Sequence, residues 1–477
     1  MNVSSFVISG FKWSSFSQYS RQVLQLITTT ILARLLDPKD FGLIGASMVF
    51  IGFAGIFKDL GTSAAIIQKK DIPKNFISSI FWFNIFLGTF FTLILILFSP
   101  LIASLYNESR LNGIIKALSI SFFLSSTSIL NQTLLEKNLE FKKIAKAEFL
   151  SSLIGAFTGI SFAFLGFGVW SLVLQALSSS FINSILLWYL TKPILSFSFN
   201  KIHLLSILKF GSNFTGFNIF NYFVRNSDVF LIGKYLGTES LGYYTLAYKL
   251  MLYPIQSITG VINRVMFPVY SQLDDDQKLR EIYIKITLGI AFFTFPLMAG
   301  ISGIGDILVI AVFGEKWRLS GTILMILAPV GLLQSIDCTT GSLFLAKGRT
   351  DILFRWGIVT GLVTLVAVII GLNWGIIGVA FSYLFVNLLW LYPAYYFPFK
   401  LINYSVKDFL GNFINVLLLS LTMLSFILIL KNILTFNLKV NLILLILAGV
   451  LVYGVANFLF NRSQMNYIYN VITLRNR

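Results

Sequence analysis

The sequence contains little charge and few of the residues that build metal or disulfide sites. Only 12% of its 477 residues are charged, and it has a single histidine, His203, and a single cysteine, Cys338. One cysteine excludes an internal disulfide framework and a thiolate metal cluster. A Walker-type phosphate loop, an HExxH motif and a GxSxG motif are also missing, so ATP-driven transport, zinc proteolysis and serine hydrolysis lack support. We therefore expect no enzyme, no metal site and no bound cofactor.

Hydrophobic residues predominate in the sequence. Hydrophobic residues make up 56% of the chain and its mean hydropathy is +0.83, whereas roughly 25% of the residues in a soluble domain are charged. Apolar runs near the spanning length of about 20 residues recur from end to end, without the alternation of a β-barrel. The sequence predicts an all-α, polytopic membrane protein of about 14 spans, near 10–33, 41–66, 76–100, 112–134, 145–166, 168–190, 207–232, 240–265, 284–305, 320–345, 352–371, 374–396, 408–430 and 440–460.

The placement of basic residues predicts an orientation. Lysine and arginine outnumber the acidic residues 36 to 19. If the N-terminus is inside, the loops on that side hold 23 basic residues and the opposite loops hold nine. Because basic residues gather in short cytoplasmic loops, both termini are predicted to be cytoplasmic. The positive charge thus serves orientation, and we expect no nucleic-acid partner.

Two weak internal alignments indicate a repeat. Residues 31–46 align without gaps on 231–246, which pairs Gly42 with Gly242, and 165–172 align on 372–379, which pairs Gly168 with Gly375. Each copy holds six spans, so both enter the membrane in the same direction, as in parallel-repeat transporters. Chance similarity between apolar helices is the alternative. The predicted units are an N-terminal lobe, a C-terminal lobe, and two further spans with a cytoplasmic tail, at 1–200, 201–400 and 401–477.

Charged residues inside predicted spans are the candidates for a binding site, since such charges usually face a cavity or a partner. In the seventh span Arg225 and Asp228 are three residues apart, on one helical face where they can pair. Asn221 and Tyr222 precede them. This pattern predicts a cationic, hydrogen-bonding wall for a pyrophosphate and sugar hydroxyls. A structural ion pair between helices is the alternative.

Charges in other spans extend this candidate site. Arg21 lies in the first span, one helical turn from the position that corresponds to Arg225 in the repeat, and Lys249 lies in the eighth. Two guanidinium groups at related depths suit a doubly charged anion, because their forks match phosphate oxygens. For Arg21, a snorkelling or helix-contact role is the alternative. Asp59 and Asp337 are candidate ion-coupling groups, with locally satisfied polar contacts as the alternative.

Four stretches of the sequence carry a family resemblance. They are "LARLLDPKDFGLIGASMVFIGFAGIFKDLGTSAAIIQKK" (32–70), "RNSDVFLIGKYLGTESLGYYTLAYKLMLYP" running to "NRVMFPVYSQLDDDQKLR" (225–280), "VFGEKWRLSGTILMILAP" (312–329) and "LAKGRTDILFRW" (345–356). Through them the chain resembles polysaccharide exporters of the multidrug/oligosaccharidyl-lipid/polysaccharide flippase superfamily, of the colanic-acid/teichuronic-acid type. The family's RxxD…GxxLG stretch falls on Arg225, Asp228, Gly233 and Gly237.

The resemblance implies two helical lobes around a cationic central cavity, with alternating access between the faces of a bacterial plasma membrane. The implied cargo is an undecaprenyl-diphosphate-linked oligosaccharide, flipped to the outer leaflet before polymerisation. Membrane lipids, a polysaccharide polymerase and assembly proteins are the implied partners. The driving force stays open between a proton gradient, a sodium gradient and mass action from polymerisation.

Three other functions are weighed against this one. A drug or cation antiporter of the same superfamily would need acidic groups in the cavity, and a membrane polysaccharide polymerase would need a long extracytoplasmic loop with reactive side chains. The basic bias and the short loops argue against both. A lipid-linked peptidoglycan precursor stays open as the cargo.

Overall fold

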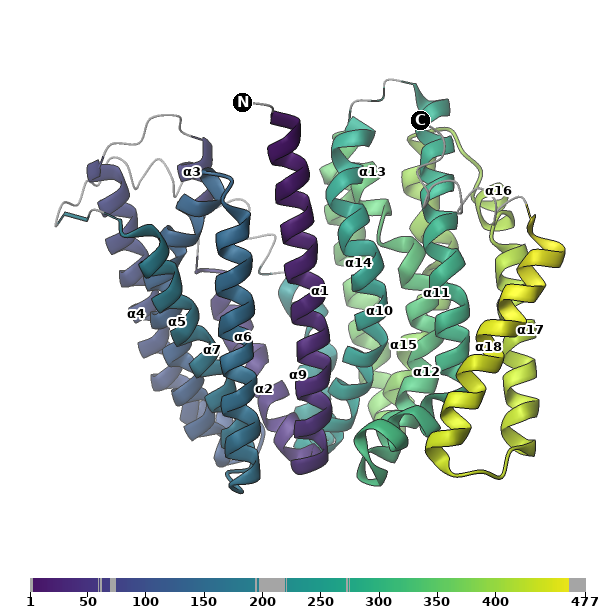
Figure 1. Ribbon diagram of the computed structural model, residues 1–477, viewed down its shortest axis with the longest axis horizontal. Coiled ribbons are helices and arrows are strands. Elements are labelled where there is room, and N and C mark those ends of the chain that lie inside the picture. Colours follow the sequence, from purple (N-terminus) through teal and green to yellow (C-terminus); the bar gives the residue numbers. More distant parts are fainter. Residues whose placement is uncertain are drawn as a thin grey trace. The chain divides into compact units, whose positions relative to one another are not determined.

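The computed structural model describes residues 3–58, 60, 62–68, 74–193, 195–196, 219, 221–271, 273 and 275–462, and helices account for most of them (Figure 1). The chain forms two compact units, Met1–Gly242 and Tyr243–Arg477. This boundary falls inside a helix, whereas the predicted lobes divide the chain in the loop near residue 200. The assignment of six spans to each lobe stays a prediction.

The first unit is built from long antiparallel helices. Helix α4 packs on α5, α6 packs on α7, and α1 packs along α6. Its helices are α1 (Val3–Leu35), α2 (Pro38–Gly55), α3 (Thr62–Gln68), α4 (Lys74–Leu105), α5 (Arg110–Lys137), α6 (Phe141–Phe164), α7 (Val169–Thr191), α9 (Ser227–Tyr235) and the first residues of α10 (Gly237–Ser271).

The second unit continues α10 and adds three helical hairpins. Helix α11 packs on α12, α14 pairs with α15, and α17 packs on both α11 and α18. Its further helices are α11 (Asp276–Phe313), α12 (Arg318–Asp337), α13 (Thr340–Ala346), α14 (Thr350–Gly371), α15 (Gly375–Lys400), α16 (Val406–Gly411), α17 (Ile414–Ile433) and α18 (Leu438–Phe460), with short 3-10 turns η1 (Glu315–Trp317) and η2 (Leu372–Trp374).

The prediction of a helical, polytopic membrane protein is confirmed. Nine segments of the described chain are long and apolar enough to cross a membrane, and one of them, Thr350–Lys400, contains both α14 and α15. Two predicted spans depart from a regular helix. Span 41–66 is split into α2 and α3, with Leu60 between them at φ 35°, and a branched residue at positive φ cannot continue a right-handed helix. In span 207–232, of which residues 219 and 221–232 are described, the helix is distorted at Asn226, whose φ is −113° and ψ 8°, although its N–H still donates to the carbonyl of Tyr222 at 3.1 Å.

The start of α2 shows why this helix begins where it does. Asp37 precedes it in an extended conformation and Pro38 occupies its first position, where the fixed φ of proline suits a helix and its missing N–H is not needed. The side chain of Asp40 then accepts a hydrogen bond from the backbone N–H of Asp37 at 3.3 Å. This capping arrangement fixes the turn between α1 and α2.

Two glycines of the first unit lie in a close backbone contact. A Cβ atom on Gly42 would lie 1.5 Å from the carbonyl oxygen of Thr238, and one on Gly242 would lie 1.9 Å from that of Pro38. The contact is reciprocal, as it is around a two-fold axis. Because Gly42 and Gly242 are also paired in the sequence alignment, the contact agrees with the predicted repeat.

The second aligned pair of glycines shares one backbone conformation. Gly168 precedes α7 with φ 55° and ψ −133°, and Gly375 begins α15 with φ 69° and ψ −161°. Residues with a side chain rarely adopt this region. The same conformation at the start of the second helix of each hairpin supports the equivalence of α6–α7 and α14–α15.

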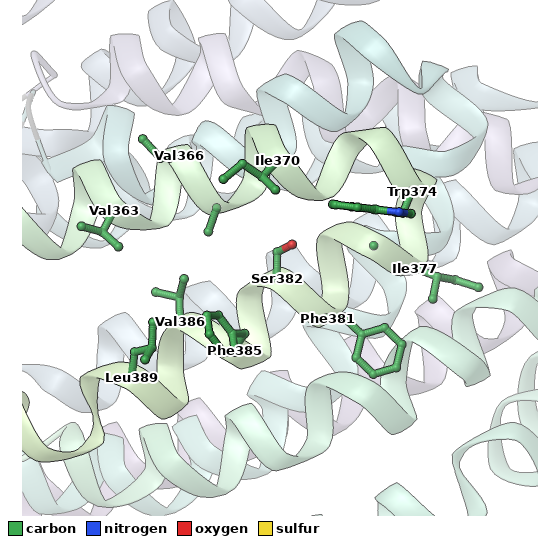
Figure 2. Close-up of a pocket in the computed structure, with 12 residues that line it drawn as sticks. Val363, Val366, Ile370, Trp374, Ile377, Phe381, Ser382, Phe385, Val386 and Leu389 are labelled. Atoms are coloured by element: carbon green, nitrogen blue, oxygen red, sulfur yellow. The ribbon is translucent and has the colours of Figure 1, made fainter.

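Polar contacts and a groove distinguish the second unit. Lys431 of α17 binds Asp306 of α11 through both carboxylate oxygens, at 2.7 and 2.9 Å, and also contacts the carbonyl of Gly303 at 3.1 Å. The Tyr453 hydroxyl of α18 donates to the carbonyl of Phe292 at 2.9 Å. These bonds attach the last two spans to α11. On another side of the unit, an apolar groove opens between α14 and α15 (Figure 2).

Candidate functional site

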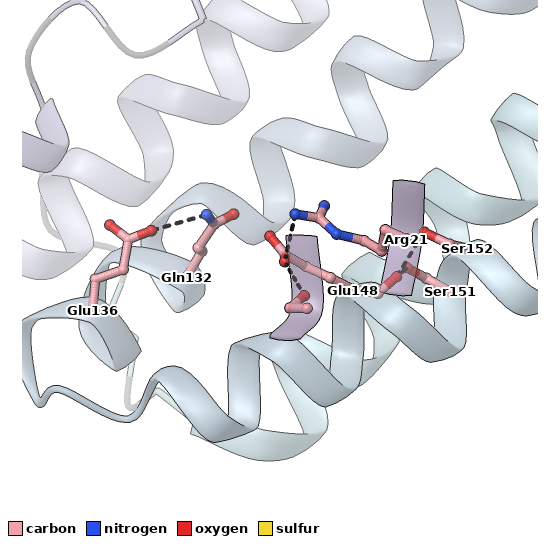
Figure 3. A network of polar contacts seen from close by, with 7 residues as sticks. Arg21, Gln132, Glu136, Glu148, Ser151 and Ser152 are labelled. Carbon is pink, nitrogen blue, oxygen red and sulfur yellow. Dashed lines mark hydrogen bonds and ion pairs between the residues drawn. The ribbon is translucent and has the colours of Figure 1, made fainter. Parts of the chain in front are cut away.

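Arg21 lies within an ion pair between α1 and α6. One terminal guanidinium nitrogen of Arg21 lies 3.1 Å from Oε2 of Glu148, and the hydroxyl of Ser17 donates to the same oxygen at 3.2 Å. Figure 3 shows Arg21 and Glu148 reaching toward each other from their two helices. Both side chains are partly exposed on the surface of the unit, at 39% and 25%. The pair is therefore accessible, unlike a sealed core salt bridge.

The guanidinium of Arg21 has donors to spare. Its Nε is buried and meets no acceptor among the described residues. A guanidinium carries five N–H donors in a fixed fork that matches phosphate oxygens, and Glu148 engages one nitrogen. An incoming phosphate could compete with Glu148 for the cation and also use the remaining donors. Arg21 thus has the chemistry of an anion site whose resident counter-ion is a protein carboxylate.

Further polar side chains surround this pair. Gln132 donates to Glu136 at 2.9 Å on α5, and the hydroxyls of Ser151 and Ser152 donate to the backbone carbonyl of Glu148 at 3.0 and 2.7 Å (Figure 3). The sequence prediction missed Glu148 and this cluster. Glu148 lies in the second turn of α6, and a single acidic residue inside a predicted span was the signal that could have identified it.

The residues predicted around Arg225 do not form the expected pair. Arg225 is exposed and Asp228 is buried on either side of Asn226, and within the described chain no ion pair joins them. An oxygen of Asp228 accepts the backbone N–H of Val229 at 2.8 Å. The i, i+3 argument assumed regular helical geometry, and Asn226 between the two residues departs from that geometry. Arg225 remains an exposed cation of the first unit.

Tyr222 has a structural contact in this conformation. Its hydroxyl donates to the carbonyl of Val49 in α2 at 2.8 Å, and Gly52 provides the room, since a Cβ there would lie 2.3 Å from the same hydroxyl. Asn221 lies beside Tyr222 and is half-buried. The predicted binding roles of these two residues stay predictions, and Tyr222 also attaches its helical segment to α2.

The predicted residues of the second unit lie on different helices. Lys249 is exposed on α10, and Asp337 at the end of α12 is half-buried and accepts a hydrogen bond from the hydroxyl of Thr340 at 3.1 Å. A locally satisfied polar contact of this kind is the alternative that the sequence leaves open for Asp337 beside ion coupling. Asp59 lies outside the described residues.

A polar cluster that the prediction missed lies between α12 and α15. The side-chain amide of Gln334 donates to the hydroxyl of Tyr383 at 3.1 Å and to Oδ1 of Asn387 at 3.2 Å. The ring of Tyr248 in α10 meets that of Tyr383 edge-on, with centroids 6.3 Å apart. Amides and phenols of this kind can replace water around sugar hydroxyls. An isolated Gln and Asn in otherwise apolar spans were the signal in the sequence.

One end of the first unit carries a compact charge cluster. Glu108, between α4 and α5, binds Lys39 at 2.8 Å and Arg110 at 3.2 Å, and Arg110 also approaches Asp40 at 3.9 Å. Burial would raise the pKa of Glu108, but hydrogen bonds and positive charge from Lys39 and Arg110 outweigh it and lower the pKa below its usual 4.5. The cluster ties the α4–α5 connection to the start of α2.

This cluster predicts acid sensitivity. A carboxylate with a lower pKa in the folded state stabilises the fold above its ordinary pKa, and the contribution is lost as the pH falls through the folded value. We expect the wild-type protein to lose thermal stability between about pH 5 and pH 3. Glu108→Gln should be less stable at pH 7 and lose less over that interval. Thermal unfolding in detergent measures this, with the exposed Glu315, paired to Arg318, as the matched position for Glu315→Gln. Equal acid sensitivity of wild type and Glu108→Gln would contradict the assignment.

Metal ligation finds no support in the described part of the chain. No three His, Cys, Asp or Glu residues there are grouped so that they could hold a metal ion.

The family model of polysaccharide biosynthesis proteins matches residues 31–322. The chain belongs to this family. It is 32% identical over 404 residues to the lipopolysaccharide biosynthesis protein WzxC of Escherichia coli, covering 82% of this chain and 81% of the relative. It is 30% identical over 359 residues to the teichuronic acid biosynthesis protein TuaB of Bacillus subtilis, covering 73% of each. The predicted resemblance to polysaccharide exporters is confirmed.

The fold is shared with a solved transporter. An inward closed structure of the lipid II flippase MurJ superposes with a TM-score of 0.75 and 20% identity, over 94% of this chain and 99% of that one. At this level of identity the likeness concerns the fold. This polysaccharide biosynthesis protein therefore has the architecture of a membrane flippase.

Proposed function

We propose that this polysaccharide biosynthesis protein moves an undecaprenyl-diphosphate-linked oligosaccharide from the cytoplasmic to the outer leaflet of a bacterial plasma membrane by alternating access. The observation that carries the proposal is the Arg21–Glu148 pair. It is a partly exposed guanidinium inside a membrane-spanning unit, with donors left over and a single carboxylate as its counter-ion. Family membership supports a polysaccharide precursor as the cargo, and the shared fold supports transport without chemical conversion.

The proposed cycle uses the described residues in separate roles. The diphosphate displaces Glu148 from Arg21 and takes up its free donors, because charge-assisted hydrogen bonds to phosphate are strong. Arg225, an exposed cation of the same unit, completes the neutralisation of the diphosphate, and Lys249 stays a candidate cation of the second unit. The amide and phenol groups of Gln334 and Tyr383 receive sugar hydroxyls. Rocking of the lobes about the bound headgroup then opens the opposite face.

The energy source and the orientation belong to the same proposal. Glu148, released from Arg21 by the substrate, is a carboxylate that could take up a proton or a sodium ion, and Asp337 and Asp59 remain candidates for such coupling. Both termini are proposed to be cytoplasmic, as the basic loops predict. A polymerase and assembly proteins on the outer side would consume the delivered unit.

A vesicle experiment tests the proposed function. Lipid-linked oligosaccharides would be analysed in inside-out and right-side-out membrane vesicles from cells depleted of the protein and from cells complemented with it. We expect intact repeat units to accumulate on the cytoplasmic face upon depletion and surface polysaccharide to be lost. Normal outward delivery with a defect only in chain lengthening or in drug resistance would overturn the proposal and point to a polymerase or an antiporter.

A further inference from the structure

The groove between α14 and α15 has the dimensions and chemistry of a hydrocarbon site. Its volume is about 630 Å³, and along α15 it extends from Ile377 to Leu389, roughly 18 Å of helix. Its lining is aliphatic and aromatic with Ser382 as the single hydroxyl, and no charged side chain contributes. Figure 2 shows side chains of α14 and α15 facing each other across it. Pockets of this size hold single ligand molecules.

The equivalent hairpin of the first unit is closed. A Cβ on Gly159 of α6 would lie 2.9 Å from Cβ of Gln175 in α7, and a Cβ on Gly155 would lie 2.8 Å from Cβ of Ser179. These two glycines let the helices approach closely well away from the turn. In the α6–α7 hairpin, side chains of the partner helix therefore occupy the place where the second unit has its groove.

The two hairpins differ in side-chain size at these positions. In the alignment that pairs Gly168 with Gly375, Val366 takes the position of Gly159 and Leu362 that of Gly155. Helices α14 and α15 still approach each other closely beside the turn that joins them, since a Cβ on Gly378 would lie 2.4 Å from the carbonyl of Gly371. Beyond that crossing, Val366 lines the groove with 53% of its surface exposed. The second copy of the repeat thus has a groove that the first copy lacks, and the two sequences differ at the positions compared.

The far end of the groove offers groups for an anion. Arg355, Val359 and Val366 follow at spacings of four and seven residues, which places them on one stripe of α14. Arg355 is exposed and forms no ion pair with any described residue. The rings of Trp356 and Trp390 meet at 5.0 Å, and the buried Nε1 of Trp390 meets no acceptor in the described chain. A cation and an unused donor therefore lie beyond the same end of an apolar channel.

We propose that this groove binds the polyisoprenoid chain of the lipid-linked substrate as it enters from the cytoplasmic leaflet, with its diphosphate near Arg355 before the diphosphate passes to Arg21. A long hydrocarbon chain with an anionic head is the ligand that matches an apolar groove ending beside a basic residue. In the proposed orientation Arg355 lies at the cytoplasmic end, where the substrate is made. The inference rests on the proposed function and adds to it a first binding place for the lipid, before the headgroup reaches Arg21.

Crosslinking at matched positions tests the occupant directly. Ile370 lines the groove and Ile369 does not, yet both are exposed, at 50% and 47%. Benzoylphenylalanine would be placed at each position in turn in the full chain, in vesicles of phosphatidylethanolamine and phosphatidylglycerol containing a trace of radiolabelled undecaprenyl diphosphate. We expect at least fivefold more labelled adduct from position 370. Equal labelling at both positions, or phospholipid adducts alone at position 370, would overturn the proposal.

The headgroup contact is tested by competition in the same vesicles. Unlabelled undecaprenyl diphosphate should suppress the adduct at position 370 severalfold more than undecaprenol does, since only the diphosphate can bind Arg355. In Arg355→Gln this preference should disappear. Equal suppression by both competitors in the wild-type chain would show that Arg355 does not bind the diphosphate.

Transport by filled-groove variants separates this proposal from the proposed function. We expect Ile370→Trp to lower outward transport about tenfold and Ile369→Trp to stay within twofold of wild type. If wild type delivers the oligosaccharide and Ile370→Trp does so equally well, the groove proposal fails and the proposed function stands. If wild type delivers none, the proposed function fails, and the crosslinking with undecaprenyl diphosphate still decides whether the groove binds a polyisoprenoid.

Discussion

Replacing Gly42 with alanine is expected to destabilise the first unit severely. The added Cβ would lie 1.5 Å from the carbonyl oxygen of Thr238 and 3.0 Å from the backbone nitrogen of Gly242. Both obstacles are backbone atoms, which cannot rotate away as a flexible side chain could, so the start of α2 would have to move. Overpacking of this kind costs about 3 kcal/mol. Thermal unfolding in detergent should show the loss for Gly42→Ala and, by the reciprocal contact with Pro38, for Gly242→Ala.

The same helix provides the control for this prediction. Gly55 ends α2, and a Cβ there would meet nothing within 4 Å. Gly55→Ala should therefore leave thermal stability within experimental error or raise it slightly, because alanine favours a helix more than glycine does. A similar effect of the two substitutions would mean that the loss at Gly42 comes from helix propensity or from the detergent, and the close backbone contact would lose its importance.

The helices and their pairing could be predicted because they depend on local pattern. Apolar runs of spanning length gave the long helices such as α4, α5 and α18, since burial in lipid leaves the backbone no other partner than itself. The alignment of Gly168 with Gly375 anticipated a shared backbone conformation, because positive φ at a turn selects glycine. Such features are determined by a few adjacent residues.

The interruptions of helices were harder to predict from composition. The runs 41–66 and 207–232 are apolar enough for a span, but Leu60 and Asn226 depart from helical geometry. Neither position is marked by proline. Hydropathy reports whether a segment prefers lipid, and a non-helical residue covered by protein leaves that average almost unchanged. The expected Arg225–Asp228 ion pair does not form in the described chain, and Asn226 between the two residues departs from regular helical geometry.

The rest of the candidate site depends on contacts between residues that are distant in the sequence. Arg21 was chosen for its charge inside a span, but its counter-ion, Glu148, depends on how α1 and α6 are rotated against each other. The groove between α14 and α15 likewise depends on a comparison between Val366 and its counterpart Gly159. The periodicity of a single helix predicts neither the Arg21–Glu148 contact nor the groove, because both depend on how the helices pack.

Arg21→Ala is expected to lower outward transport ten- to a hundredfold with only a small change in thermal stability. A hydrogen bond to a charged group contributes about 1.5–3 kcal/mol, and each 1.4 kcal/mol of lost substrate interaction corresponds to a factor of about ten. The ion pair with Glu148 is partly exposed, so its loss should affect stability little. Arg21→Lys should be intermediate, since an ammonium cannot bind phosphate in a bidentate way. The vesicle assay measures transport, and Arg225→Ala tests the second cation in the same way.

A double variant separates substrate binding from a structural role of this pair. If Arg21 only clamps α1 to α6, its loss leaves Glu148 as an unpaired charge, and Arg21→Ala combined with Glu148→Ala should recover much of the transport. If Arg21 receives the diphosphate, the double variant should remain as defective as Arg21→Ala. Arg318→Ala, which breaks an exposed ion pair with Glu315 in the second unit, controls for the removal of an arginine as such. Wild-type transport by a folded Arg21→Ala protein would show that the diphosphate binds elsewhere.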